Sequence, residues 1–133
     1  MKAVCYIEPG KVTIEDKPKP SVGEPTAAVV KVTTSAICGS DLHFYHGRIP
    51  GMTRGFIVGH EAIGIVESVG AGVHRVKPGD RVVVSDFAVC GTCWYCRRRS
   101  FTNCTTARVF GFGEVFGNLP GGRSAAERIE KRE

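Results

Sequence analysis

The sequence has few aromatic residues and no long apolar run. Aromatic side chains make up 8% of the 133 residues, and there is a single tryptophan. No apolar stretch reaches the roughly 20 residues that a membrane-spanning helix needs. The N-terminus shows no charged-then-apolar signal region. We therefore expect a soluble, cytoplasmic protein with no membrane partner.

Acidic residues are fewer than basic ones, which gives a formal net charge of +5. Part of this excess comes from the run Arg97, Arg98 and Arg99, and the rest from scattered basic residues. No helix-turn-helix, zinc-finger or aromatic stacking pattern accompanies these charges. We interpret the basic balance as a solvated surface and expect no nucleic-acid partner.

A dinucleotide-binding fingerprint is also missing. Gly64, Gly70 and Gly72 interrupt or follow a predicted strand and do not open a helix in G-x-G-x-x-G order. Turns, bulges and close backbone approach account for them. A chain of this length has room for one ordinary domain. We expect no Rossmann domain within this sequence and no binding of NAD or NADP by this chain.

Short strands punctuated by glycine and proline dominate the pattern. Strands are predicted over five runs: 2–7, 11–16, 27–37, 62–69 and 81–84. The first two flank Pro9-Gly10, which predicts a hairpin or a tight turn. Short helices are predicted over 40–45 and 94–101 and in the tail from 124. The pattern indicates a mainly β domain, a small barrel or sandwich.

Four cysteines form a C-x2-C-x2-C-x7-C run: Cys90, Cys93, Cys96 and Cys104. This spacing lets one loop, over about 88–106, surround a single tetrahedral zinc with four thiolates. Such a closed site contributes folding energy and leaves no position open for chemistry. One alternative is a disulfide framework, which the missing signal peptide disfavours. Another is a four-iron cluster, whose usual run has a three-residue gap before the fourth cysteine and a proline after it.

A second group of metal-binding residue types lies upstream. Cys38 is followed about twenty residues later by His60 and Glu61, so that a thiol, an imidazole and a carboxylate fall at two predicted strand ends. Taken alone, Cys38 is best interpreted as a small buried side chain and His60 as a core histidine. Their joint occurrence favours an open zinc site.

Three motifs, in order, resemble those of zinc-dependent medium-chain alcohol dehydrogenases. They are Cys38-Gly39-Ser40-Asp41-x-His43, then Gly59-His60-Glu61-x-x-Gly64, and then the four-cysteine run. The resemblance covers about 1–122 and implies the N-terminal catalytic domain of that family, a GroES-like β-barrel from which the zinc lobe projects. Residues 123–133 are left as a charged tail, expected to be helical or disordered.

The resemblance implies a catalytic zinc held by Cys38 and His60, with Glu61 close to the metal. Asp41 matches a carboxylate that orients His60 from behind. The implied reaction is NAD(P)-dependent oxidation of an alcohol to an aldehyde or ketone via a zinc-bound alkoxide, with nicotinamide as the hydride acceptor.

Four further residues take roles by the same resemblance. Ser40 and His43 match a proton relay from the alcohol towards solvent; the alternative for His43 is an ordinary surface histidine. Asp86 and Phe87 fall where the family places substrate-pocket residues, and a plain loop and core pair is the alternative.

The family continues into a dinucleotide-binding domain and then returns to complete the catalytic domain, whereas this sequence stops at Glu133. We expect a truncated catalytic domain that is inactive alone, with its catalytic zinc site partly filled or empty. Open strand edges predict self-association, and a separate dinucleotide-binding chain is a second candidate partner. The competing function is a zinc-stabilised binding or subunit module without catalysis of its own.

Overall fold

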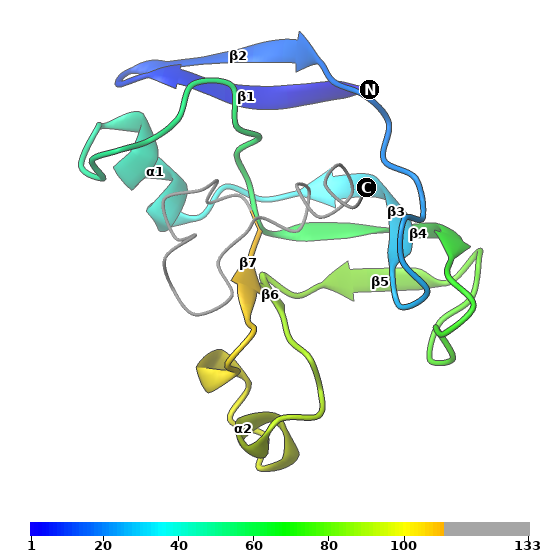
Figure 1. Cartoon of the computed structure of the whole chain (residues 1–133). Helices are drawn as coiled ribbons and strands as arrows, with labels where there is room; N and C mark the ends of the chain where they lie inside the picture. Colours follow the sequence, from blue (N-terminus) through cyan, green and yellow to red (C-terminus); the bar gives the residue numbers. More distant parts are fainter. Residues whose placement is uncertain (111–133) are drawn as a thin grey trace.

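The fold begins with a β-hairpin, as the sequence predicts. A computed structural model describes residues 1–110, so the expected tail over 123–133 lies outside the described residues (Figure 1). Strand β1 (Lys2–Glu8) pairs antiparallel with β2 (Lys11–Asp16). Gly10 in the turn has a φ of 76°, a left-handed conformation that glycine adopts without steric cost. Three consecutive residues of β1 are buried: Cys5, Tyr6 and Ile7.

A three-stranded antiparallel sheet follows, in the order β3-β4-β5. Its strands are β3 (Ala28–Ser35), β4 (Ala62–Val69) and β5 (Arg81–Val84). Gly64 sits where β3 and β4 approach closely, and a Cβ there would collide with the carbonyl oxygen of Lys31 and with Cγ1 of Val30. Glycine at this position therefore permits the close pairing of the two strands.

The segment over 54–58, which begins with a turn at 54–55, lies between α1 and β4 and runs beside the hairpin. Its backbone bonds to β1, with the Tyr6 N–H donating to the Phe56 carbonyl at 3.0 Å and the Val58 N–H donating to the Val4 carbonyl at 2.9 Å. The segment ends at Gly59, whose φ of 109° favours glycine. This turn delivers the next residue, His60, to the start of β4.

Helix α1 (Gly39–Tyr45) follows β3 and packs its Phe44 side chain into the core. Phe44 is 1% exposed, and its ring meets that of Phe56 edge-on at 5.8 Å between centroids. Phe56 also contacts the Tyr6 ring at 5.3 Å. These rings fix α1 against β1 and the 54–58 segment, so they position the residues at the start of the helix.

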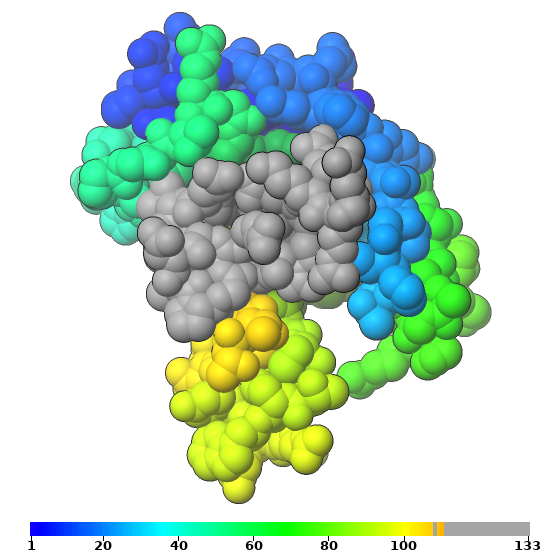
Figure 2. Space-filling model, in the orientation of Figure 1, coloured from blue at the N-terminus to red at the C-terminus, as the bar shows by residue number. Residues whose placement is uncertain are grey.

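The cysteine lobe projects from this body on a two-stranded stem (Figures 1 and 2). The stem consists of β6 (Phe87–Ala88) and β7 (Arg108–Val109), which pair antiparallel. Between them lie α2 (Trp94–Arg97) and a 3-10 turn, η1 (Phe101–Asn103). The stem and its two short helices agree with the predicted projecting lobe.

The mainly β prediction with short helices is confirmed, with three corrections of detail. Within residues 1–110 the ladders form three separate sheets and do not close into a barrel. The strand predicted over 27–37 ends at Ser35, because the chain must turn there into α1. The helix predicted over 94–101 stops after Arg97. In the described residues no helix is long and apolar enough to cross a membrane.

Candidate metal centres

The four lobe cysteines converge on one point. The Cys90 sulfur lies 3.6 Å from that of Cys104 and 4.0 Å from that of Cys96. All four sulfurs, including that of Cys93, lie within 4.8 Å of one another. Four sulfurs at about 2.3 Å from a central zinc, at tetrahedral angles, would be about 3.8 Å apart. The cluster therefore fits one zinc ion.

These distances also weigh against the two alternatives for the cluster. A disulfide brings its sulfurs to about 2.05 Å, and all six cysteines are free thiols. A four-iron cluster would keep its thiolates farther apart, because its own iron and sulfide atoms lie between them. A single tetrahedral ion is the best match.

Backbone N–H groups and burial act on the cluster in opposite directions. Donation from the Thr92 and Cys93 N–H groups lowers the pKa of Cys90 to about 5. Burial raises the pKa of Cys96 to about 12. Metal binding must displace the Cys96 proton, so zinc affinity should rise with pH.

Helix α2 is ended by a left-handed residue that carries the chain towards the fourth ligand. Arg99 has a φ of 61°, and its N–H donates to the Cys96 carbonyl at 3.0 Å, while the Ser100 N–H donates to the Tyr95 carbonyl at 3.0 Å. This is a Schellman arrangement, which usually employs glycine. It directs the chain into η1, after which Cys104 rejoins Cys90.

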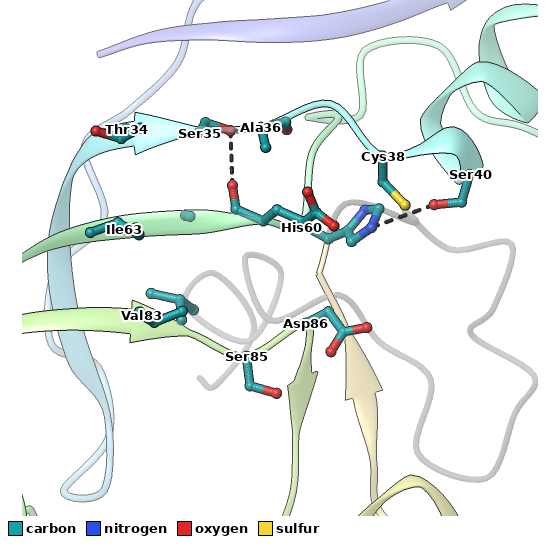
Figure 3. Close-up of a pocket in the computed structure, with 13 residues that line it drawn as sticks. Thr34, Ser35, Ala36, Cys38, Ser40, His60, Ile63, Val83, Ser85 and Asp86 are labelled. Carbon is teal, nitrogen blue, oxygen red and sulfur yellow. Dashed lines mark hydrogen bonds between the residues drawn. The ribbon is translucent and has the colours of Figure 1, made fainter.

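The second group of predicted ligands also comes together (Figure 3). Ligand atoms of Cys38, His60 and Glu61 lie within 4.8 Å of one another. Cys38 caps the N-terminus of α1, and the other two residues precede β4. His60 is buried, Cys38 is half-buried and Glu61 is exposed. A thiol, an imidazole nitrogen and a carboxylate are all zinc ligands, so the donor set fits zinc on a solvent-accessible wall.

Asp41 links the two ligand-bearing segments. One oxygen, Oδ2, accepts a hydrogen bond from the Cys38 N–H at 2.9 Å, and the other, Oδ1, lies 3.4 Å from Nδ1 of His60. Both side chains are largely buried. The carboxylate therefore holds the ring so that Nε2 faces Cys38 and Ser40, the usual arrangement behind a ligating histidine.

Ser40 interacts with two of the three candidate ligands, His60 and Cys38. Its hydroxyl oxygen lies 3.4 Å from Nε2 of His60. Its hydroxyl and its backbone N–H, together with His60, lower the pKa of the Cys38 thiol. A lower pKa leaves more of the Cys38 side chain as the thiolate, which is the form that binds a metal ion.

Of the other predicted site residues, the structure places some in the pocket and others outside it. Asp86 lines the same pocket as Cys38 and His60, whereas Phe87 starts β6 and is not part of the described lining. His43 is exposed on α1, and among residues 1–110 no hydrogen bond joins it to Ser40. Only the Ser40 half of the predicted relay lies in the pocket.

The pocket has a volume of about 640 Å³, and the sequence did not predict several of the residues that line it. Four of them come from the ends of β3, β4 and β5 and from the loop after β5: Thr34, Ile63, Val83 and Ser85. They meet only because the three strands pair in a particular register. No local motif marks them.

Replacing Asp41 by Asn should weaken zinc binding by Cys38 and His60 about 10- to 100-fold, because the charge behind the imidazole is lost. Competition with a chromophoric chelator measures this affinity separately from the tighter lobe site. Asp16→Asn, which neutralises an exposed carboxylate paired with Lys2, is the matched control. Equal affinities for the second zinc in both variants would contradict the role given to Asp41.

Comparison with known proteins now identifies the family. The profile of the alcohol dehydrogenase GroES-like domain matches residues 24–130. The chain belongs to this family, as the three motifs predicted. It corresponds to the N-terminal domain of zinc-type alcohol dehydrogenases, which are oxidoreductases, and this family implies zinc and NAD(P) as cofactors.

Individual relatives cover most of the chain. An uncharacterized zinc-type alcohol dehydrogenase-like protein of Bacillus subtilis (strain 168) is 39% identical over 97% of this chain and 36% of the relative. Zinc-type alcohol dehydrogenase B of Aspergillus flavus is 41% identical over 88% of this chain and 27% of the relative. The chain thus spans roughly a third of the length of the curated relatives that it matches.

Solved structures of alcohol dehydrogenases support the same family assignment. The alcohol dehydrogenase of Thermus sp. ATN1 superposes with a TM-score of 0.83 at 44% identity, covering 91% of this chain and 35% of that one. The alcohol dehydrogenase of the archaeon Aeropyrum pernix gives a TM-score of 0.73 at 27% identity, covering 84% and 34%. The GroES-like fold assignment is confirmed.

Proposed function

We propose that this chain provides the zinc-binding catalytic half of an NAD(P)-dependent alcohol dehydrogenase. The observation that carries this proposal is the convergence of Cys38, His60 and Glu61 on one pocket wall. A zinc ion there would act as a Lewis acid that makes an alcohol easier to deprotonate. In this proposal the four-cysteine lobe holds a second, structural zinc.

Each residue around the site has a separate role in this proposal. Cys38 and His60 supply the firm ligands, and the exposed Glu61 carboxylate a weaker one. Asp41 keeps His60 in one tautomer from 3.4 Å. The Ser40 hydroxyl, beside His60, is placed to accept the proton of an alcohol and pass it outwards. His43, exposed on the same helix, would release that proton to solvent.

We propose that nicotinamide is supplied by a dinucleotide-binding region outside these 133 residues, because no side chain here can accept a hydride. Self-association through the outer edge of β5, the last strand in the order β3-β4-β5, belongs to the same proposal. So does a cytoplasmic location, which the six free thiols support.

Zinc titration of the purified chain tests the proposal. We expect two binding events, a tight one at the lobe and a weaker one at Cys38 and His60, since a site with fewer protein ligands holds zinc less firmly. Cys38→Ser and His60→Ala should each weaken the second event about 100-fold or more and leave the first unchanged.

His43→Ala is the matched control, because this histidine lies on the same helix but outside the pocket. It should keep both binding events. If Cys38→Ser and His60→Ala also keep both, the catalytic assignment is wrong, and a zinc-stabilised subunit module without catalysis takes its place.

A further inference from the structure

Within residues 1–110, the lining of the pocket beside the second candidate metal centre has carboxylates and no lysine or arginine. None of its 13 described lining residues is lysine or arginine. Two are carboxylates, Glu61 and Asp86, and four others carry hydroxyl groups: Thr34, Ser35, Ser40 and Ser85. Such a wall offers hydrogen-bond acceptors to a ligand and repels anions.

Asp86 is the carboxylate that the metal site does not use. It lies between β5 and β6, opposite Cys38 and Ser40, with the His60 ring between them in Figure 3. Its backbone carbonyl accepts a hydrogen bond from the Phe110 N–H at 3.0 Å. Within residues 1–110, its half-buried side chain forms no hydrogen bond or ion pair.

The charge of Asp86 persists when the metal centre is filled. A divalent zinc held there would be balanced by the Cys38 thiolate and the Glu61 carboxylate. Asp41 faces His60 from behind the site. Asp86 therefore remains as an unbalanced acceptor in the same pocket as Cys38, Ser40 and His60.

We propose that Asp86 is a specificity-determining residue that selects alcohols bearing a second hydrogen-bond donor near the reacting hydroxyl, and that it rejects anionic alcohols. The donor is a hydroxyl, as in a diol or polyol, or an ammonium, as in an amino alcohol. This inference rests on the proposed function, since it assigns the substrate class of the same pocket. Phosphorylated and carboxylated alcohols fall outside this class.

Alkylation of Cys38 reports the charge of the pocket without any turnover. The protein is given one equivalent of zinc, which the lobe takes first, and the adduct at Cys38 is followed by peptide mass spectrometry. Iodoacetate and iodoacetamide carry the same reactive carbon but differ in charge. Taking the ratio of their rate constants cancels any change in the thiolate fraction. Asp86→Asn should raise the iodoacetate-to-iodoacetamide ratio about threefold to tenfold.

Asp16→Asn removes the same charge at an exposed, distant position and should leave the ratio unchanged. Cys5 does not interfere, because it is fully buried and burial raises the pKa of its thiol. A ratio that is the same in wild type and Asp86→Asn would overturn the proposal. The zinc titration above would be unaffected by that result, so the two claims fail separately.

Protection of Cys38 by small alcohols tests the substrate class. 1,2-Propanediol should protect against iodoacetamide at several-fold lower concentration than 1-propanol, and Asp86→Ala should abolish the difference. Protection by 1-amino-2-propanol that is lost in Asp86→Asn would identify an ammonium as the donor. The amide oxygen of Asp86→Asn can still accept a hydrogen bond. If the diol protects this variant nearly as well as the wild type, the donor is a hydroxyl. Equal protection by all three compounds in the wild type would contradict the assignment.

Discussion

Cys96→Ser is expected to abolish tight zinc binding in the lobe and to unfold it. Cys96 is 4% exposed and lies 4.0 Å from Cys90 across the cluster. A serine hydroxyl does not ionise near neutral pH, so the shell would lose one of its four anionic ligands. Apparent zinc-binding free energies at such closed sites are about 10–16 kcal/mol, and that energy is folding energy. The zinc content, measured by metal analysis after dialysis, should fall by one ion per chain.

Cys5→Ala is the control for this substitution, because it removes a thiol that is completely buried but far along the chain from the cluster. It should retain the tightly held zinc. A Cys96→Ser protein with the wild-type zinc content, or a well-folded metal-free wild type with disulfides in the lobe, would refute the structural zinc.

Phe44→Ala should lower the free energy of unfolding by about 3–5 kcal/mol, the usual cost of emptying an aromatic site in a core. Phe44 is 1% exposed and is among the largest fully buried side chains of the described residues. Its ring holds α1 against Phe56, and α1 carries Cys38 at its N-terminal cap. The second zinc should therefore also bind more weakly. Urea denaturation with one zinc bound measures the stability.

Leu42→Ala is the matched control, because Leu42 lies two residues away on the same helix but on its exposed side. Leu42 is 47% exposed, so its truncation should cost less than about 1 kcal/mol. Similar losses from the two substitutions would show that α1 is not anchored through its inner face.

Both groups of candidate zinc ligands could be predicted from the sequence, for different reasons. The lobe ligands fall within one short stretch, so their spacing alone constrains the loop. Cys38 and His60 are far apart in the sequence, so the prediction that they share a site came from their ligand types at two predicted strand ends and from the order of the three motifs. The hairpin was also predictable, because Pro9-Gly10 stands between two apolar runs.

Features that depend on long-range pairing or on an exceptional backbone were not predictable. Arg99 ends α2 in a left-handed conformation that sequence rules assign to glycine or asparagine, so the predicted helix ran too long. Thr34 and Ser85 reach the pocket only through the pairing of β3, β4 and β5. His43 is exposed because Phe44, the next residue of α1, packs into the core. The sequence of so short a helix does not show which of its sides faces inward.

The most direct test of the central claim is a crystal structure of the zinc-loaded chain with anomalous data collected at the zinc absorption edge. We predict a strong peak among the four lobe sulfurs and a second, weaker peak within bonding distance of the Cys38 sulfur and His60 Nε2. A peak at the lobe alone under excess zinc, with the Cys38 and His60 side chains directed apart, would contradict the account of this domain as a catalytic zinc site.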